Sequence, residues 1–184
     1  MLTEIGAKQF GLLHELVPNA MNFAALVSAT APNAEAFTRD VQTAAATTGR
    51  QVKIHAPNTN RDIDAAFARM VRDQTEAVLV GPGPLFGNRS GQIATLSLSH
   101  RLPTMFTARE GVYAGGLISY GSSTADSARQ AAIYVARILN GEKPGDLPVQ
   151  RTTKFELVIN LQTARVFGIE VPSTLLTIAD EVID

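Results

Sequence analysis

Strand-like apolar runs alternate with helical patterns through the first hundred residues, and this repetition restricts the fold more than any other sequence feature. The run Met21–Ala29 (MNFAALVSA) is almost unbroken apolar sequence, as expected for a strand buried on both faces of a parallel sheet. The predicted strands are 21–29, 51–56, 76–80 and 104–107, and the predicted helices are 8–17, 34–48, 61–72 and one ending near His100. This alternation predicts an α/β fold: an open parallel Rossmann-like sheet flanked by helices, with right-handed crossovers.

Local signals set the ends of these elements. Pro18 ends the first helix, because the residue before a proline is pushed out of the helical conformation. Gly49 is a C-terminal stop for the helix 34–48. The turn 57–60 is polar, and Asn60 is the residue predicted to cap the helix that follows.

The stretch Arg109–Gly121 (REGVYAGGLISYG) separates the repeating part of the chain from the rest. Arg109 and Glu110 directly follow a predicted buried strand, so we expect them at a strand end, where α/β folds bind ligands. Gly115 and Gly116 precede an alternating segment and another glycine, a pattern typical of a hinge strand that connects two bodies. The alternative is an ordinary turn followed by an edge strand.

The last third of the chain has a different rhythm. Ser122 and Ser123 are predicted to cap a helix over Ala125–Leu139, followed by short strands at 147–149 and 155–160 and short helices at 161–167 and 173–179. These segments show no sheet of their own. We therefore expect the apolar faces of the helix and of the strand 155–160 to be covered by a partner.

Composition excludes several functional classes. The formal net charge is -1 and there is no basic block, so neither nucleic acid nor an anionic membrane is an expected partner. The chain has no cysteine, which excludes disulfides and thiolate catalysis. It shows no basic segment followed by an apolar core near Met1, and no apolar run of the roughly 18 residues that span a bilayer, so no export signal is predicted.

No motif predicts an enzyme. His14, His55 and His100 lack metal-ligand spacing, and the sequence has no GxSxG elbow, so we expect no metal, no cofactor and no catalytic residue. The loop 81–87 (GPGPLFG) is not a phosphate loop, because two of its first four residues are prolines and the phosphate-binding lysine is missing. It is either a rigid loop that offers backbone groups to an uncharged part of a ligand or a structural turn.

Arg109 is the remaining candidate for binding a charged ligand. A guanidinium at a strand end can bind a carboxylate through two hydrogen bonds, whereas the alternative is an internal ion pair with Glu110 or another neighbour.

Several segments, in this order, resemble the C-terminal portion of ABC-transporter substrate-binding proteins with the type I periplasmic-binding-protein fold: HELVP, AALVSATAPNAEAF, EAVLVGPGPLF, HRLPTMFTAREGVYAGGLISYG and the tail from LPVQRTTKFELVINLQTA to the end. The resemblance implies two Rossmann-like lobes joined by hinge strands. On this mapping 1–20 is a leading helix, 21–115 is a ligand-binding lobe, and 116–184 is the hinge return with segments of an N-terminal lobe that, with a signal peptide, would precede residue 1. The helix after Ser122 and the strand 155–160 would belong to that other lobe.

The resemblance also implies a site and partners. The loops facing the cleft and the hinge return would supply the ligand-binding residues, namely Ala31, Asn33, Asn58, Pro82, Gly83, Leu85, Arg109 and Glu110 from the loops and Tyr120 from the hinge return. Family members often have an acidic residue where this chain has Gly83, so this loop is not expected to bind a ligand ammonium. The implied ligand is a small-molecule solute, most often an amino acid or similar carboxylate. The implied partner is an ABC permease in the membrane, and the binding protein itself would be periplasmic or lipid-anchored outside the cytoplasm.

Two other functional classes are compatible with the pattern: a small flavodoxin-like enzyme, whose flavin would colour the purified protein, and a sensory or regulatory ligand-binding domain. A homodimer through residues 122–184 is the predicted way to cover the apolar faces of the tail, and the alternative is that the tail folds back onto its own lobe.

Overall fold

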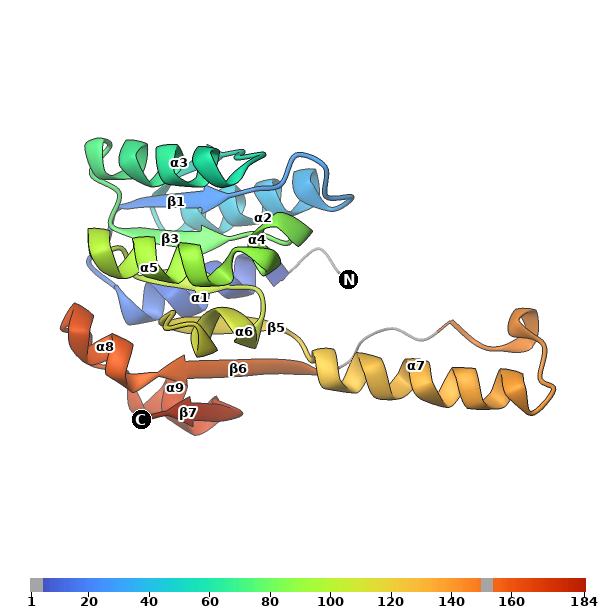
Figure 1. The fold of residues 1–184 in the computed structure, drawn as a ribbon. Helices are drawn as coiled ribbons and strands as arrows, with labels where there is room; N and C mark the ends of the chain where they lie inside the picture. Colours follow the sequence, from blue (N-terminus) through green and yellow to red (C-terminus); the bar gives the residue numbers. More distant parts are fainter. Residues whose placement is uncertain (1–4, 150–153) are drawn as a thin grey trace.

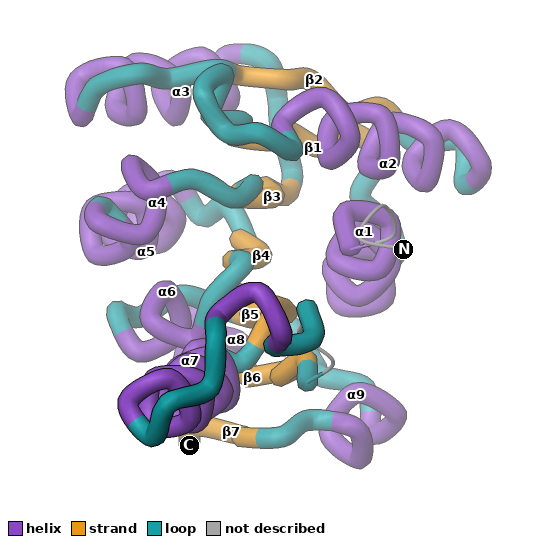
Figure 2. Tube along the Cα trace, turned by 90° about the vertical axis from the view of Figure 1, so that its right-hand side faces the viewer, coloured by secondary structure: helices purple, strands orange, loops and turns teal. Residues whose placement is uncertain are grey.

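The computed structural model describes residues 5–149 and 154–184 and has a seven-stranded sheet between two layers of helices (Figures 1 and 2). The strands are β1 (Asn22–Leu26), β2 (Gln51–His55), β3 (Ala77–Val80), β4 (Thr104–Phe106), β5 (Ile118–Ser122), β6 (Phe155–Asn160) and β7 (Glu181–Ile183), in the spatial order β2-β1-β3-β4-β5-β6-β7. All neighbouring pairs are parallel except β5 and β6, which are antiparallel. The predicted α/β fold with a parallel sheet is therefore confirmed.

Helices cover both faces of the sheet. They are α1 (Ile5–Leu16), α2 (Ala34–Thr47), α3 (Asn60–Arg72), α4 (Pro84–Asn88), α5 (Ser90–His100), α6 (Arg109–Tyr113), α7 (Thr124–Leu139), α8 (Leu161–Phe167) and α9 (Ser173–Ile178), with a 3-10 turn at Pro144–Asp146. Figure 2 shows α1, α2 and α9 on one face and α3, α4, α5 and α6 on the other. The short helix α6 was not predicted, because its five residues are too few to show a helical period.

The apolar pattern of the strands explains why the sheet is buried on both faces. All four residues of β3 are buried, as are four of the five in β1, and the side chains alternate between two cores. One core, around Phe10 and Phe23, lies under α1 and α2, and the other, around Phe67 and Phe86, lies under α3 and α5. Burial of each such ring contributes about 1.5–3 kcal/mol.

Capping residues fix the starts of two helices. Thr59, and not Asn60, is the N-cap of α3: its hydroxyl accepts from the backbone N–H of Asp62, whose carboxylate accepts from the backbone N–H of Thr59. The prediction for Asn60 was wrong by one residue, because only Thr59 has the extended conformation that this capping box requires. The predicted cap Ser123 is confirmed, since its hydroxyl accepts from the N–H of Asp126 at 3.2 Å.

The tail corrects two predictions. Residues 147–149 form no strand, and the apolar face of β6 is covered within this chain: β6 pairs with β5 along five residues, and β7 extends the same sheet. Leu157 and Ile159 are buried in the core under α1. The sheet of this chain therefore covers the apolar strand itself. Residues 1–4, within the predicted leading segment, and 150–153, within the tail that carries the resemblance, lie outside the described residues.

The helix α7 is not covered. It extends away from the sheet beyond the ends of β1 and β3 (Figure 1), and none of its residues is buried. Its large apolar side chains include Val135 and Leu139, which are 55% and 81% exposed. The predicted need for a covering partner thus applies to α7 and not to β6. None of the helices in the described ranges has the length and apolar character that crossing a membrane requires.

Candidate functional site

The parallel strands bring the predicted ligand-binding loops to one edge of the sheet. Because β1, β2, β3 and β4 run in the same direction, the loops that follow them, at 27–33, 56–59, 81–83 and 107–108, emerge at their common C-terminal edge. The strand order reverses between β1 and β3, since the chain leaves β1 toward β2 and returns to the other side of β1. Open α/β sheets bind ligands outside such a switch point.

The loops after β1 and β3 touch each other at this point. A Cβ on Gly83 would lie 2.7 Å from the Cβ of Ser28, closer than real side chains approach, so only glycine permits the contact. Ser28 is itself nearly buried, and its hydroxyl lies 3.2 Å from that of Thr30. A Cβ on Gly81 would lie 2.8 Å from the carbonyl oxygen of Leu26, at the end of β1. Close packing against β1 and its following loop therefore explains Gly81 and Gly83, and it holds the start of the loop GPGPLFG in place at the edge.

The predicted residues from the first three loops differ in exposure. Asn33 and Asn58 are exposed, whereas Ala31, Pro82, Gly83 and Leu85 are partly buried. The side chain of Asn33 makes no capping bond to α2, although the residue stands at its N-cap position. These residues lie along the same edge, but Asn58 follows the outermost strand, β2, and is the farthest from β4 and β5 in the strand order.

An apolar pocket opens beside the ends of β3 and β4. Its volume is about 290 Å³, and its lining residues are Val80, Phe86, Gly87, Ser90, Phe106, Thr107, Ala108, Glu110, Gly111 and Thr124. They come from β3, β4, the short helices α4 and α6, and the starts of α5 and α7. Phe86 and Phe106 were not predicted as site residues, because buried aromatic residues after apolar strands are normally part of the core.

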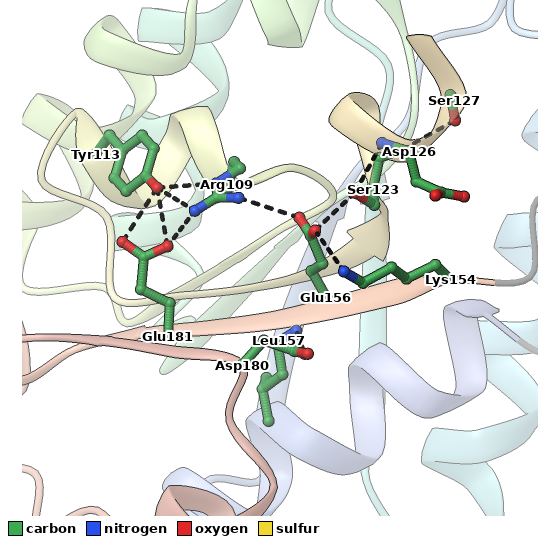
Figure 3. A network of polar contacts seen from close by, with 10 residues as sticks. All are labelled: Arg109, Tyr113, Ser123, Asp126, Ser127, Lys154, Glu156, Leu157, Asp180 and Glu181. Carbon is green, nitrogen blue, oxygen red and sulfur yellow. Dashed lines mark hydrogen bonds and ion pairs between the residues drawn. The ribbon is translucent and has the colours of Figure 1, made fainter. Parts of the chain in front are cut away.

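Glu110 lines this pocket, whereas its neighbour Arg109 points into an ion-pair network (Figure 3). The guanidinium of Arg109 contacts the carboxylates of Glu156, at 3.3 Å from Nη1, and of Glu181. It also donates to the Tyr113 hydroxyl, with Nε at 2.9 Å. The Tyr113 hydrogen bond, followed by the nearby carboxylates, raises the pKa of Arg109 above its usual value.

The guanidinium of Arg109 is paired within the chain, with Glu156 and Glu181 and not with Glu110. Its role as a ligand-binding residue stays a prediction. Glu156 and Glu181 lie 47 and 72 residues further along the chain and reach Arg109 only because β6 and β7 join the sheet. Neither contact has a signal in the sequence pattern. A ligand carboxylate at Arg109 would compete with these two side chains.

Glu156 connects the network to the exposed helix α7. Its Oε1 accepts a 2.6 Å hydrogen bond from the Ser123 hydroxyl, and Lys154 Nζ lies 3.9 Å from the same oxygen. Ser123 is the N-cap of α7, and its backbone N–H donates to the carbonyl of Lys154. One carboxylate on β6 therefore contacts both Arg109, at the start of α6, and the residue from which α7 departs.

Tyr120 lies on β5, in the segment that was predicted to alternate like a strand. Its ring stacks on Phe155 of β6, with centroids 5.7 Å apart, and packs against the core under α1. Burial, and then the nearby Asp180, raise the pKa of Tyr120. Its backbone carbonyl accepts a 2.6 Å hydrogen bond from Gln9 of α1. Tyr120 therefore joins the two strands that lead to α7.

The glycines of the segment 109–121 serve the packing of Phe106 and Thr107. Cβ atoms on Gly111 and Gly116 would overlap the Phe106 ring, and one on Gly121 would overlap the backbone of Thr107. Gly115 has a φ of 102°, which side chains rarely adopt. Close packing therefore explains why Gly116 and Gly121 are glycines without any hinge motion. A hinge role for this segment stays a prediction.

The described residues hold no group of three or more His, Asp or Glu side chains arranged for a metal ion. His14 and His55 therefore belong to no such group, and burial lowers the pKa of each below its usual value.

Comparison with known proteins identifies the family of this chain. A family described as ABC transporter substrate binding protein matches residues 4–183. The fold is similar to an ABC domain from Streptococcus pneumoniae solved in complex with L-Trp, with a TM-score of 0.85 and 25% identity over 97% of this chain and 62% of that one. A conserved domain protein from Vibrio cholerae has a TM-score of 0.86 at 22% identity, over 97% and 60% of the two chains.

A third solved structure is the ligand-free, open form of a substrate-binding protein with adhesive properties from Clostridium difficile, with a TM-score of 0.69 and 18% identity over 96% of this chain and 59% of that one. The comparison with curated proteins gives no match. The present chain thus spans about three fifths of the length of these solved proteins. From the match over residues 4–183, and from a fold shared along nearly its whole length, we conclude that the chain belongs to the family of ABC transporter substrate-binding proteins.

Proposed function

We propose that this chain supplies one wall of the solute-binding cleft of an ABC import system, and that the solute lies over the C-terminal edge of the sheet. The observation that carries the proposal is the family match, together with the loops that this fold delivers to a topological switch point. The family consists of solute-binding proteins and not of enzymes. In this proposal the loops after β1, β3 and β4 contact the solute through Ala31, Asn33, Pro82, Gly83, Leu85 and Glu110, and Asn58 lies at the periphery.

The proposed solute is an amino acid. The Streptococcus pneumoniae protein was solved with L-Trp, and its fold agrees with the present one over 97% of this chain. The composition of the edge supports a ligand that is only partly polar, since small, apolar and uncharged residues dominate the loops after β1 and β3. Arg109 and Tyr120 enter the proposal as residues that position the strands and α6, because both are engaged within the chain.

We further propose the division that the family resemblance implied, with residues 21–115 as the ligand-binding lobe and 116–184 as the segment that leads to and from a second body. The pair β5 and β6 would act as the connecting strands, because α7 departs from the end of β5 and the chain returns through β6. In the cell the working protein would act outside the cytoplasmic membrane, periplasmic or lipid-anchored, and deliver its solute to an ABC permease.

A second copy of the chain is the proposed cover of α7. Ile133, Val135, Ile138 and Leu139 expose apolar surface on one helix, and a two-fold axis would let two such helices pack on each other. Light scattering of the chain at low micromolar concentration should give twice 19.6 kDa, and Leu139→Glu should return the mass to that of one chain. A single-chain mass for the unmodified protein would contradict the dimer.

A titration followed by NMR tests the solute proposal. We expect L-tryptophan, added to the ¹⁵N-labelled chain at concentrations up to about 10 mM, to shift amides in the loops 27–33, 81–85 and 107–110, with weak affinity because one wall leaves the ligand partly in water. A neutral sugar serves as the matched control and should leave these amides in place. Shifts confined to the opposite edge of the sheet, or a response to the sugar and not to the amino acid, would contradict the proposal.

A further inference from the structure

The pocket beside β3 and β4 combines an apolar interior with one charged group. Phe86 and Phe106 are 2% and 3% exposed, and Val80 is 2% exposed. The interior of the pocket is therefore formed by apolar side chains that expose little surface. The volume of about 290 Å³ lies at the lower end of pockets that hold small molecules, which are about 300–1,000 Å³. Such a pocket fits one apolar group better than a whole polar solute.

Glu110 is the charged group among the lining residues. Glu110 is exposed, and its carboxylate takes part in none of the ion pairs of the described ranges. Arg109, the adjacent cation, is turned to Glu156 and Glu181. The rim of the pocket therefore presents a carboxylate whose charge is not neutralised by the chain.

The other polar residues of the lining are uncharged. Ser90, Thr107 and Thr124 bring hydroxyl groups, while Gly87 and Gly111 expose backbone. An anionic group on a ligand would meet Glu110 here without a compensating cation, and a like charge is destabilising in a partly desolvated site. A cationic group would gain a charge-assisted hydrogen bond.

We propose that this pocket takes the apolar, ring-bearing side group of the solute and that Glu110 binds its ammonium group. The inference rests on the proposed function and names the part of the solute that this lobe recognises: a ring and an ammonium, with the carboxylate left to other contacts. Specificity in this lobe then comes from Glu110 and the two phenylalanines, and not from a carboxylate clamp at Arg109.

Three related probes separate these contributions: L-tryptophan, tryptamine, which lacks the carboxylate, and indole-3-propionate, which lacks the ammonium. Titrated into the ¹⁵N-labelled chain at pH 7, tryptamine should shift the amides around the pocket with a Kd no weaker than that of L-tryptophan. Indole-3-propionate should bind about tenfold or more weakly, because it cannot make the charge-assisted bond to Glu110.

Variants of the chain complete the test. Glu110→Gln should weaken tryptamine about tenfold and remove most of the difference between tryptamine and indole-3-propionate, whereas the control Glu35→Gln, on α2 outside this pocket, should change neither. Gly87→Met should weaken all three probes while the fold is kept, because a Cβ on Gly87 meets no heavy atom within 4 Å and a longer side chain can enter the pocket.

Each outcome has a distinct meaning. Tryptophan binding that is equally strong in Glu110→Gln would reject the role of Glu110 and leave the proposed function intact. Indole-3-propionate that binds as tightly as tryptamine would reject the ammonium preference in the same way. If none of the three probes shifts an amide at the C-terminal edge, both the pocket assignment and the amino-acid proposal are wrong.

Discussion

Replacement of Gly121 by alanine tests how tightly β5 packs against the end of β4. Gly121 pairs with Glu156 in the β5 and β6 ladder and faces the backbone of Thr107. A Cβ at this position would lie 2.9 Å from the Thr107 carbonyl carbon and much closer still to the carbonyl oxygen. Real Cβ atoms essentially never lie within 3.0 Å of another heavy atom. The obstacle is backbone, so no rotamer change can relieve the overlap.

The magnitude follows from this geometry. Either the Thr107 peptide or β5 must shift by more than about 1 Å, and overpacking of this kind costs about 1–3 kcal/mol of the free energy of unfolding. Gly11→Ala is the matched control: Gly11 lies in the middle of α1, is exposed, and has open space where the Cβ would lie. Alanine should stabilise that helix by about 0.5–1 kcal/mol.

Urea unfolding followed by circular dichroism measures both effects. With a slope of about 2 kcal/mol per molar urea, the midpoint should fall by about 0.5–1.5 M in Gly121→Ala and rise by about 0.25–0.5 M in Gly11→Ala. The shift of Thr107 should also move the amide signals of Ala108 and Glu110, since these residues follow it directly. A Gly121→Ala protein with the midpoint of the parent would refute the close approach of β5 to Thr107.

Three further changes have defined outcomes. Ser123→Ala removes the hydroxyl that caps α7 and donates to Glu156, so we expect a loss of about 1 kcal/mol and faster amide exchange in the first turn of α7; unchanged exchange there would contradict the capping role. Asp62→Asn tests the capping box of α3, in which the Thr59 hydroxyl, and then the Asn58 N–H, lower the pKa of Asp62 below its unfolded value. The ionised carboxylate therefore contributes to stability above the unfolded pKa, and this contribution is lost as the pH falls through the lower folded pKa. In urea titrations the variant should lose less stability than the parent between about pH 5 and 3. Burial lowers the pKa of His55, so below about pH 6.5 the unfolded chain binds more protons than the folded one, and acid destabilises the fold. His55→Gln should therefore reduce the loss of stability between about pH 7 and 5. An identical pH profile in parent and variant would show that His55 is not the group concerned.

The elements that sequence periodicity predicted well are those whose partners lie next to them along the chain. Strands such as Ala77–Val80 are continuous apolar runs because helices cover both faces of the sheet, so their burial can be predicted from the residue types alone. The helix 161–167 was predicted with its observed bounds, since Asn160 supplies a cap and Gly168 a left-handed stop. The common edge of the loops also followed from the parallel order alone.

The features that escaped prediction depend on contacts between distant segments. Glu181 lies on a three-residue strand that shows no pattern of its own, and it reaches Arg109 only after β6 and β7 have joined the sheet. The same addition explains why the apolar face of the strand 155–160 is buried within this chain. Phe86 and Phe106 have the sequence signature of core residues, and only the arrangement of α4, α6 and α7 around them leaves a pocket.

Direct contacts between solute and chain provide the most decisive measurement. Isotope-filtered NOE spectra of unlabelled L-tryptophan with the ¹³C-labelled chain should show transfer from the indole protons to the rings of Phe86 and Phe106 and to the methyl groups of Val80. Transfer only to residues at the opposite edge, such as those around Asn22, Gln51 and Thr75 at the N-terminal ends of the strands, would contradict the assignment of the C-terminal edge as the solute-binding wall.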